Sequence, residues 1–293
     1  MKIFIRKVIF FHSILFLFFI VNIVANYIIF NNSKVPVKKA NIWIVGDSHP
    51  QKGFKPTSFL SAENISKPGE PYVVSFWKLK YIFKQKHPDT LIIGFSQHNF
   101  SAFNDQKFSD KKWEATMFER TYLIGDFKDL KDIKVDNKAY YNMFFRKMCL
   151  FPTNKHFEFL GKYVNSAKSK VTDTDEAIKR HFFYKDKIVG LSNTSSSYLD
   201  SIINLCKIYN VKPILIGIPV TKVYFDKIPN LYKTHYETEK KKWSMNHVPV
   251  VDMTNTFYAD KFYLNSDHLN DIGAAFFSNQ VREYFATNNN VNK

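Results

Sequence analysis

The sequence predicts an α/β protein with a mostly parallel β-sheet covered by helices on both faces, preceded by one transmembrane helix. Three observations support this. Short apolar segments of strand length alternate with segments whose apolar residues recur at helical spacing. An apolar segment long enough to cross a bilayer stands near the N-terminus. The 293 residues, 45% of them hydrophobic, suffice for one large domain with a full core.

The apolar segment at residues 8–30 follows three basic residues between positions 2 and 7. A cleaved signal peptide is the alternative, but its apolar region is usually shorter and ends at a small-residue cleavage site, which is not evident here. We therefore expect an uncleaved single-pass anchor. The basic flank favours a cytoplasmic N-terminus and an extracytoplasmic domain, although lysines between positions 34 and 39 weaken the contrast.

A regular alternation follows a short polar linker at residues 31–40. Strands are expected at residues 41–45, 64–66, 89–95, 212–220 and 248–253. Helices are expected at residues 72–86, 195–209, 228–245 and 271–287, with a loop or short helix at 51–60. This alternation favours a parallel sheet, and ligands bind such sheets at the carboxyl ends of the strands.

Residues 100–190 interrupt the alternation and are rich in Phe, Tyr and Lys. We interpret them as an insertion packed on the main sheet, with short helices at 112–119, 140–149 and 157–164. Their aromatic residues are interpreted as core, and a cap over the site is a hypothesis. The chain is thus divided into a cytoplasmic N-terminus and anchor (1–32), an α/β domain (33–287) and a disordered Asn-rich tail (288–293).

The chain is basic, with a formal net charge of +16 from 42 Lys and Arg against 26 Asp and Glu. Nucleic acid, an anionic membrane or an acidic polymer could each account for such a charge. The lysines are dispersed and no nucleic-acid motif occurs, so no nucleic-acid partner is expected, and a Lys-rich composition is an equally good explanation. Cys149 and Cys206 are not spaced as a metal site and could form one disulfide. No metal or other cofactor is expected.

The first predicted strand of the domain ends in Gly46-Asp47-Ser48-His49. Gly46 permits a sharp turn because it lacks a Cβ atom. Such a turn can present the Ser48 hydroxyl beside its own backbone N–H, as a nucleophile that creates an oxyanion requires. An unreactive polar turn is the alternative, because these are ordinary turn residues. His49 is interpreted as part of the turn or the wall of the site.

A second polar stretch, residues 263–273, lies between the last predicted strand and the last helix. His268 in this loop can reach over the sheet edge, accept the proton of Ser48 and return it to a leaving group. Asp267 or Asn265 could orient its ring. A solvated loop is the alternative, because a chain with nine histidines is expected to place one beside an aspartate by chance.

These stretches together resemble the SGNH/GDSL hydrolase superfamily. The matching residues, in the family's order and approximate spacing, are Gly46-Asp47-Ser48, Gly69, Gly94 to Asn99, and Asp267-His268-Leu269-Asn270 with Gly273. The resemblance spans residues 41–286 apart from 100–190. It is greatest to the membrane-anchored branch linked to O-acylation of extracellular polymers.

The resemblance implies a three-layer α/β/α domain of flavodoxin-like type with Ser48 as nucleophile and His268 as general base. It also implies an oxyanion hole made by the backbone N–H groups of Ser48 and Gly69 and the side chain of Asn99.

Two positions depart from the family pattern. The aspartate that the family places three residues before the histidine is Asn265 here, and Asp267 is considered a substitute for it. The family's Gly-x-Asn-Asp block is replaced by residues 94–99, so Asn99 is a best alignment and His98 competes for a polar role.

The implied function is that of a membrane-anchored serine esterase or O-acyltransferase. It would act on acyl esters of a cell-surface or secreted glycan of the cell envelope through an acyl-serine, with a multipass membrane acyltransferase as a candidate partner. A non-catalytic member that binds glycan or scaffolds an acyltransferase is the alternative, supported by Asn265. A basic adaptor for anionic polymers is a third hypothesis.

Overall fold

A five-stranded parallel sheet forms the centre of the computed structural model, which describes residues 1–165 and 173–290. The strand order is β2-β1-β3-β6-β7, and every neighbouring pair is parallel. The strands are β1 (Ile42–Val45), β2 (Ala62–Asn64), β3 (Thr90–Gly94), β6 (Lys212–Gly217) and β7 (Val250–Asp252). The predicted α/β class is confirmed, and the order is that of flavodoxin-like sheets.

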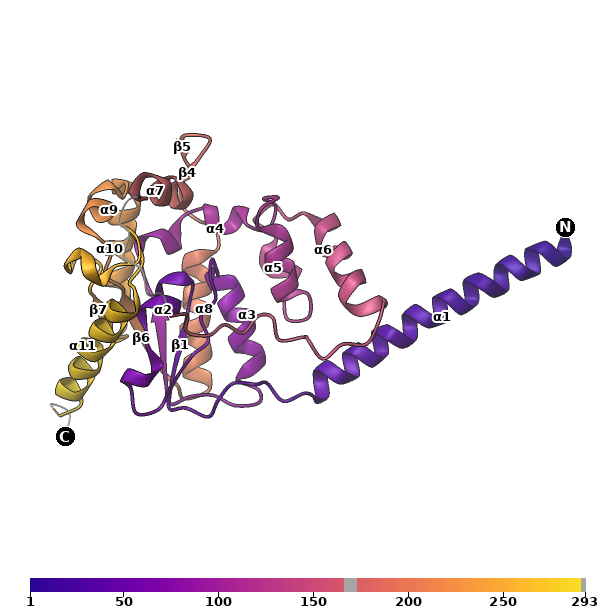
Figure 1. Ribbon diagram of the computed structural model, residues 1–293, viewed down its shortest axis with the longest axis horizontal. Helices are drawn as coiled ribbons and strands as arrows, with labels where there is room; N and C mark the ends of the chain where they lie inside the picture. The colour runs from indigo at the N-terminus through magenta and orange to yellow at the C-terminus, as the bar shows by residue number, and fades with distance from the viewer. Residues whose placement is uncertain (166–172, 291–293) are drawn as a thin grey trace.

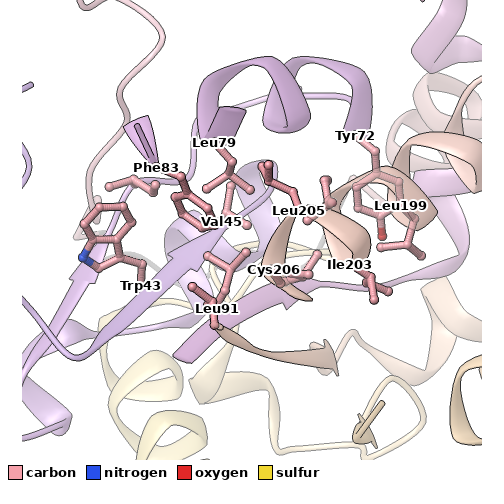
Figure 2. Packing of buried hydrophobic residues seen from close by; sticks show 14 of the residues in the cluster. Trp43, Val45, Tyr72, Leu79, Phe83, Leu91, Leu199, Ile203, Leu205 and Cys206 are labelled. Carbon is pink, nitrogen blue, oxygen red and sulfur yellow. The ribbon is translucent and has the colours of Figure 1, made fainter. Parts of the chain in front are cut away.

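Helices cover both faces of this sheet. One face carries α3 (Tyr72–Ile82), α8 (Ser195–Ile208) and α10 (Asn230–Met245), and the other carries α2 (Ser48–Gly53) and α11 (Asp271–Asn290). Figure 2 shows Leu79 and Leu205 packed over Val45 and Leu91 of the sheet. Ile44 and Phe277 belong to the core on the opposite face. Strands buried on both faces explain the continuous apolar segments of the sequence.

The carboxyl ends of β1 and β3 converge on the start of α2. Gly46 has a φ of +139°, and a Cβ atom there would lie 2.7 Å from Pro50 Cγ. A Cβ atom at Gly94 would also lie 2.7 Å from that atom. Because both strand ends carry glycine, Pro50 of α2 can pack directly against the sheet, and this contact holds Ser48 at the sheet edge.

The segment between β3 and α8 contains short elements. These are η2 (Gln97–Phe100), α4 (Phe103–Gln106), α5 (Glu114–Thr121), η3 (Phe127–Leu130), α6 (Asn137–Phe144), a π-helical turn η4 (Phe145–Cys149), α7 (Thr174–Phe182) and a hairpin of β4 (Phe183–Tyr184) and β5 (Lys187–Ile188). Elsewhere the chain forms η1 (Pro56–Ser58), α9 (Lys222–Lys227) and η5 (Asp260–Phe262). In Figure 1, α5 and α6 lie between the sheet domain and α1.

The helix predicted at residues 157–164 is wrong, because the structure has no helix there. Gly161 N donates to Ile65 O at 3.3 Å, and the Gly161 Cα lies so close to Ser66 that a Cβ atom would overlap its carbonyl oxygen. Phe159 is buried in the core beneath α3. Packing along the 65–67 loop thus overrides the local helical pattern.

Several boundaries also differ from the sequence prediction, most clearly those of the second strand and the last helix. The second strand lies at residues 62–64 and ends where it was expected to begin. The last helix continues to Asn290, so residues 288–290 of the expected disordered tail have helical backbone, and 291–293 lie outside the described residues. Cys149 and Cys206 are both buried and free.

α1 (Lys2–Asn32) is the one helix, among the described residues, that is long and apolar enough to cross a membrane. Figure 1 shows it projecting away from the domain. The C-terminal part of α1 is attached to the domain through the fully buried Asn26. Its Nδ2 donates to the carbonyls of Met148 and Phe151, each at 3.0 Å, and its Oδ1 accepts from Thr153 N at 2.8 Å.

Candidate active site

Ser48 and His268 meet at the carboxyl edge of the sheet although 220 positions separate them. Ser48 is the first residue of α2, directly after β1, and His268 lies in the loop before α11. The Ser48 Oγ to His268 Nε2 distance is 2.7 Å, which is a hydrogen bond. This geometry allows proton transfer from the hydroxyl to the imidazole.

Asn265 determines which ring nitrogen of His268 carries the proton. The Asn265 Oδ1 atom accepts the backbone N–H of His268 at 2.9 Å, so the orientation of the amide group is fixed. The same oxygen lies 3.0 Å from His268 Nδ1, which must therefore be the protonated nitrogen. The lone pair of Nε2 consequently faces Ser48, as a general base requires.

Asp267 lies on the same side of the ring and is fully buried. Its Oδ1 atom is 3.0 Å from His268 Nδ1, but the angle is poor for a hydrogen bond, so Asn265 holds the ring and Asp267 supplies charge. Its Oδ2 atom is 3.0 Å from an Arg180 guanidinium nitrogen. Burial alone would raise the pKa of Asp267, yet His268 and the other nearby histidines hold the pKa well below its ordinary value. The carboxylate thus stays ionised beside the ring.

The same surroundings determine the protonation state of His268. Burial lowers the pKa of His268 below the ordinary value of 6.5, and the attraction of Asp267 opposes this only in part. The imidazole is therefore neutral near pH 7, which is the form that can accept a proton.

Asp47 connects the ends of β1 and β3. Its Oδ1 accepts the backbone N–H of His49 at 2.9 Å, and its Oδ2 lies 2.6 Å from His98 Nε2 and accepts from Asn99 Nδ2 at 2.9 Å. Burial alone would raise the pKa of Asp47, yet electrostatic attraction and hydrogen bonds from the neighbouring His98 and His49 hold the pKa well below its ordinary value. This carboxylate therefore ties the η2 turn to the Ser48 turn.

Four imidazoles stack at this edge. The ring centroids of His49 lie 4.0 Å from those of His98 and 4.7 Å from those of His268, and His98 lies 4.9 Å from His181. His49 Nδ1 is 3.4 Å from Asp47 Oδ1, and its Nε2 is 4.0 Å from Asp267 Oδ2. His49 is thus buried between the two carboxylates, within the turn that carries Ser48.

The Ser48 and His268 side chains open into a cavity of about 360 Å³. The cavity is lined by Asp47, Ser48, Lys52, Pro68, Gly69, His98, Phe103, Asn104, Lys107, Lys112, Trp113, Arg180, His181, Asn265 and His268. Seven of these come from residues 100–190: Phe103, Asn104, Lys107, Lys112, Trp113, Arg180 and His181. The inserted region therefore forms one wall of the site.

The three predicted oxyanion-hole residues occupy different positions. Ser48 begins α2, so its backbone N–H is among those that have no partner within the helix. Gly69 has a φ of +66° and lines the cavity, with Trp113 so close that a side chain would collide with it. The Asn99 amide is directed to Asp47 and does not line the cavity. Its role as an oxyanion donor stays a prediction.

Two sets of side chains could hold a metal ion. One comprises Asp47, His49 and His98, and the other His49, Asp267 and His268, with ligand atoms within 4.8 Å of one another in each. His49 belongs to both, and the second set includes the ring that contacts Ser48. A metal in either set would engage groups that the Ser48–His268 pair depends on.

Sequence reasoning missed several residues of the site. Asp47 lies within the motif that identified Ser48 and could have been recognised from its position before the nucleophile. Lys107, Arg180 and His181 carry no motif and come from the region whose fold the sequence did not reveal. Only the tertiary structure brings them to the cavity.

Comparisons with known proteins give no family assignment. No family model matches the chain, and no curated protein matches it. Among solved structures, it is similar to a candidate acylhydrolase from Bacteroides fragilis, with 12% sequence identity over 90% of this chain and 94% of that one, and a TM-score of 0.42. This likeness is too distant to bear on the reaction, so the site geometry alone supports the function proposed below.

Proposed function

We propose that this chain is a membrane-anchored, extracytoplasmic serine esterase or O-acyltransferase that acts on acyl esters of a cell-surface or secreted glycan. The observation that carries the proposal is the 2.7 Å hydrogen bond between Ser48 Oγ and a His268 Nε2 whose lone pair faces it. This is the arrangement of an activated nucleophile with its general base and an orienting group.

In the proposed reaction, Ser48 Oγ attacks the ester carbonyl carbon while its proton passes to His268 Nε2. The tetrahedral oxyanion is stabilised by the backbone N–H groups of Ser48 and Gly69. The C–O bond to the leaving alcohol then breaks, and the alcohol takes the proton from His268. Water or a sugar hydroxyl, deprotonated in turn by His268, then attacks the acyl-serine. The bond between the acyl carbon and Ser48 Oγ breaks, and His268 returns the proton to Oγ.

In a Ser-His-Asp triad, one aspartate both orients the histidine and stabilises the imidazolium, and here we assign these two functions to Asn265 and Asp267. Asn265 keeps the tautomer through its fixed amide oxygen, and Asp267 places a buried negative charge 3.0 Å from His268 Nδ1. The imidazolium formed during catalysis is thereby stabilised. This arrangement favours a working site over the non-catalytic alternative.

The choice between hydrolysis and transfer depends on which nucleophile reaches the acyl-serine. An N-terminal anchor would hold the cavity near the membrane surface, where envelope glycans and a multipass acyltransferase partner would be available. The length and hydropathy of α1 support such an anchor.

Turnover of 4-nitrophenyl acetate by the full chain in detergent tests the proposal. We expect Ser48→Ala and His268→Ala each to lower kcat/KM by at least about a thousandfold. Lys241→Met, on the exposed face of α10, is the matched control and should behave as wild type. Folded wild-type protein with no activity above Ser48→Ala would instead favour a non-catalytic glycan-binding or scaffold protein.

A further inference from the structure

The cavity beside Ser48 is strongly cationic. Four of its lining side chains are basic, and one lining side chain is a carboxylate. The cations are Lys52, Lys107, Lys112 and Arg180. The carboxylate, Asp47, is already engaged by His98 Nε2 at 2.6 Å. Arg180 is paired with the buried Asp267, so the excess of positive charge in the walls comes from Lys52, Lys107 and Lys112.

Lys107 is the most informative of these cations. Its side chain is buried, with 4% of the residue exposed, and Nζ donates only to neutral acceptors: Gly69 O at 3.0 Å and Asn104 Oδ1 at 2.7 Å. It forms no ion pair with any carboxylate of the described residues. Trp113 and Phe103 lie beside the ammonium group. Burial lowers the pKa of Lys107 to about 8, and the charges of Asp47 and Asp105 oppose this only in part because neither carboxylate pairs with the ammonium directly.

We infer that the site takes an acidic substrate, in which a carboxylate or phosphate near the reacting ester binds against Lys107 and Lys52. The inference rests on the proposed function and specifies its substrate class. Lys107 donates to the carbonyl of Gly69, whose backbone N–H is proposed to serve the oxyanion. The anionic group of the substrate would thus lie close to the reacting carbonyl, because Gly69 contacts both.

Matched aryl acetates test this inference. The probes are 4-acetoxybenzoate, 4-acetoxyphenyl phosphate and the neutral methyl 4-acetoxybenzoate. The ratio of kcat/KM for each anionic ester to that of the neutral ester is compared between wild type and Lys107→Met, which cancels differences in leaving group. We expect the ratio to fall at least about tenfold, with Lys241→Met unchanged. The two anionic probes tell a carboxylate from a phosphate.

An unchanged ratio in Lys107→Met would overturn the anion subsite and leave the esterase proposal standing. Should Lys107→Met fail to fold, the same ratio is measured in Lys52→Met, because Lys52 is partly exposed and its loss is better tolerated. A tenfold fall supports the anion subsite, and an unchanged ratio overturns it. Binding of sodium phosphate and benzoate to Ser48→Ala, measured by isothermal titration calorimetry, keeps the test independent of catalysis. Binding lost with Lys107 supports the subsite, and absence of binding to the Lys107-containing protein contradicts it.

A separate observation concerns the membrane. If α1 spans the bilayer, the part of the domain that packs on it lies at membrane depth. Phe18 packs edge-to-face against Phe151, with 6.3 Å between ring centroids, and Phe19 packs in the same way against Phe145 at 5.3 Å. With a rise of about 1.5 Å per residue, Phe19 is roughly 18 Å beyond Lys7, within a hydrocarbon layer of about 30 Å.

The exposed side chains near these contacts include large apolar ones, as expected for a surface that contacts lipid. Tyr141, Phe145 and Phe151 are 64%, 43% and 71% exposed and all lie on one segment, and a group of exposed apolar side chains can mark an interaction surface. The nearby Lys147 is paired with Glu119 at 2.8 Å and Glu158 at 3.0 Å, and the exposed Arg146 has a side chain long enough to reach the headgroup region. We propose that residues 141–151 form a second membrane contact, inserted in the leaflet on the domain's side.

Nitroxide labels on the full chain in phosphatidylethanolamine–phosphatidylglycerol vesicles test this contact. Labels at Phe151→Cys and Tyr141→Cys should collide more with oxygen, which partitions into lipid, than with a water-soluble nickel chelate. A label at Met245→Cys, 74% exposed on the domain, should show the reverse. Labels at 141 and 151 that behave like the one at 245 would overturn the proposal. A water-accessible label at Phe10→Cys would overturn its premise.

Discussion

At the scale of single residues, the orientation of the His268 ring controls whether Ser48 can lose its proton. A backbone N–H fixes the Asn265 amide, the amide fixes the Nδ1 proton, and the Nε2 lone pair is left for Ser48. A neutral amide can perform this task because a separate carboxylate, Asp267, lies 3.0 Å from the same ring nitrogen.

Substitution of Asn265 tests this chain of contacts. Asn265→Leu removes the acceptor, and we expect kcat to fall about a hundredfold because the ring loses its tautomer and orientation. Asn265→Asp retains an acceptor at the same place and should keep most of the activity. Steady-state turnover of 4-nitrophenyl acetate measures both. Equal activity of the Leu and Asp variants would show that Asn265 does not hold the ring.

The pH profile of kcat/KM tests the ionisation of His268. Only the neutral ring can accept the Ser48 proton, and its pKa lies below the ordinary 6.5. Activity should therefore persist as pH falls through 6.5 and decline only at lower pH, where the ring becomes protonated. Asp267→Asn removes the charge that favours protonation and should shift the acidic limb further down. An acidic limb centred above 6.5 would contradict the described electrostatics.

At the scale of elements, a buried ion pair supports the loop that carries Gly69. Lys78 on α3 lies 2.6 Å from Glu70, both side chains are fully buried, and Lys78 Nζ also donates to Ile65 O at 2.8 Å. The pair thus joins α3 to both ends of the 65–70 loop, which borders the cavity.

Lys78→Met should destabilise the protein by about 3–5 kcal/mol, because it leaves the buried Glu70 carboxylate without its counter-ion and with the Ser75 hydroxyl as a neutral donor. Thermal unfolding of the full chain in detergent, followed by circular dichroism, measures the change. The double variant Lys78→Met with Glu70→Leu removes both charges and should recover most of the loss. A double variant less stable than Lys78→Met would contradict this explanation.

The sequence predicted elements well where the local pattern and the core agree. The β3 and α8 segments have their apolar residues buried against each other, and both were expected. The 157–164 segment was mistaken for a helix because its packing partner, the 65–67 loop, is about ninety residues away in sequence. Likewise, motifs identified Ser48 and His268, whereas Lys107 becomes part of the site only through tertiary contacts.

At the scale of the whole molecule, α1 is attached to the domain that holds the cavity. α1 is fixed to the domain through Asn26 and through the aromatic contacts of Phe18 and Phe19. Figure 1 shows α5 and α6 between this helix and the sheet. A domain held in this way would keep its cavity at a set height above the bilayer.

The proposed sidedness predicts how surface cysteines react on intact cells. Met245→Cys lies on the domain and should be labelled by a membrane-impermeant maleimide, whereas Lys2→Cys should be labelled only after permeabilisation. Wild-type protein gives the background, which should be low because Cys149 and Cys206 are buried. The opposite labelling pattern would place the domain in the cytoplasm.

The most direct measurement of the proposed chemistry is labelling by a fluorophosphonate, which phosphonylates only an activated serine. The full chain would be treated with the probe and the modified peptide mapped by mass spectrometry, with His268→Ala as the matched control. We predict a single phosphonyl adduct on Ser48 that is strongly reduced in His268→Ala. Folded wild-type protein that remains unlabelled, or that is labelled equally in His268→Ala, would contradict a Ser48–His268 catalytic pair.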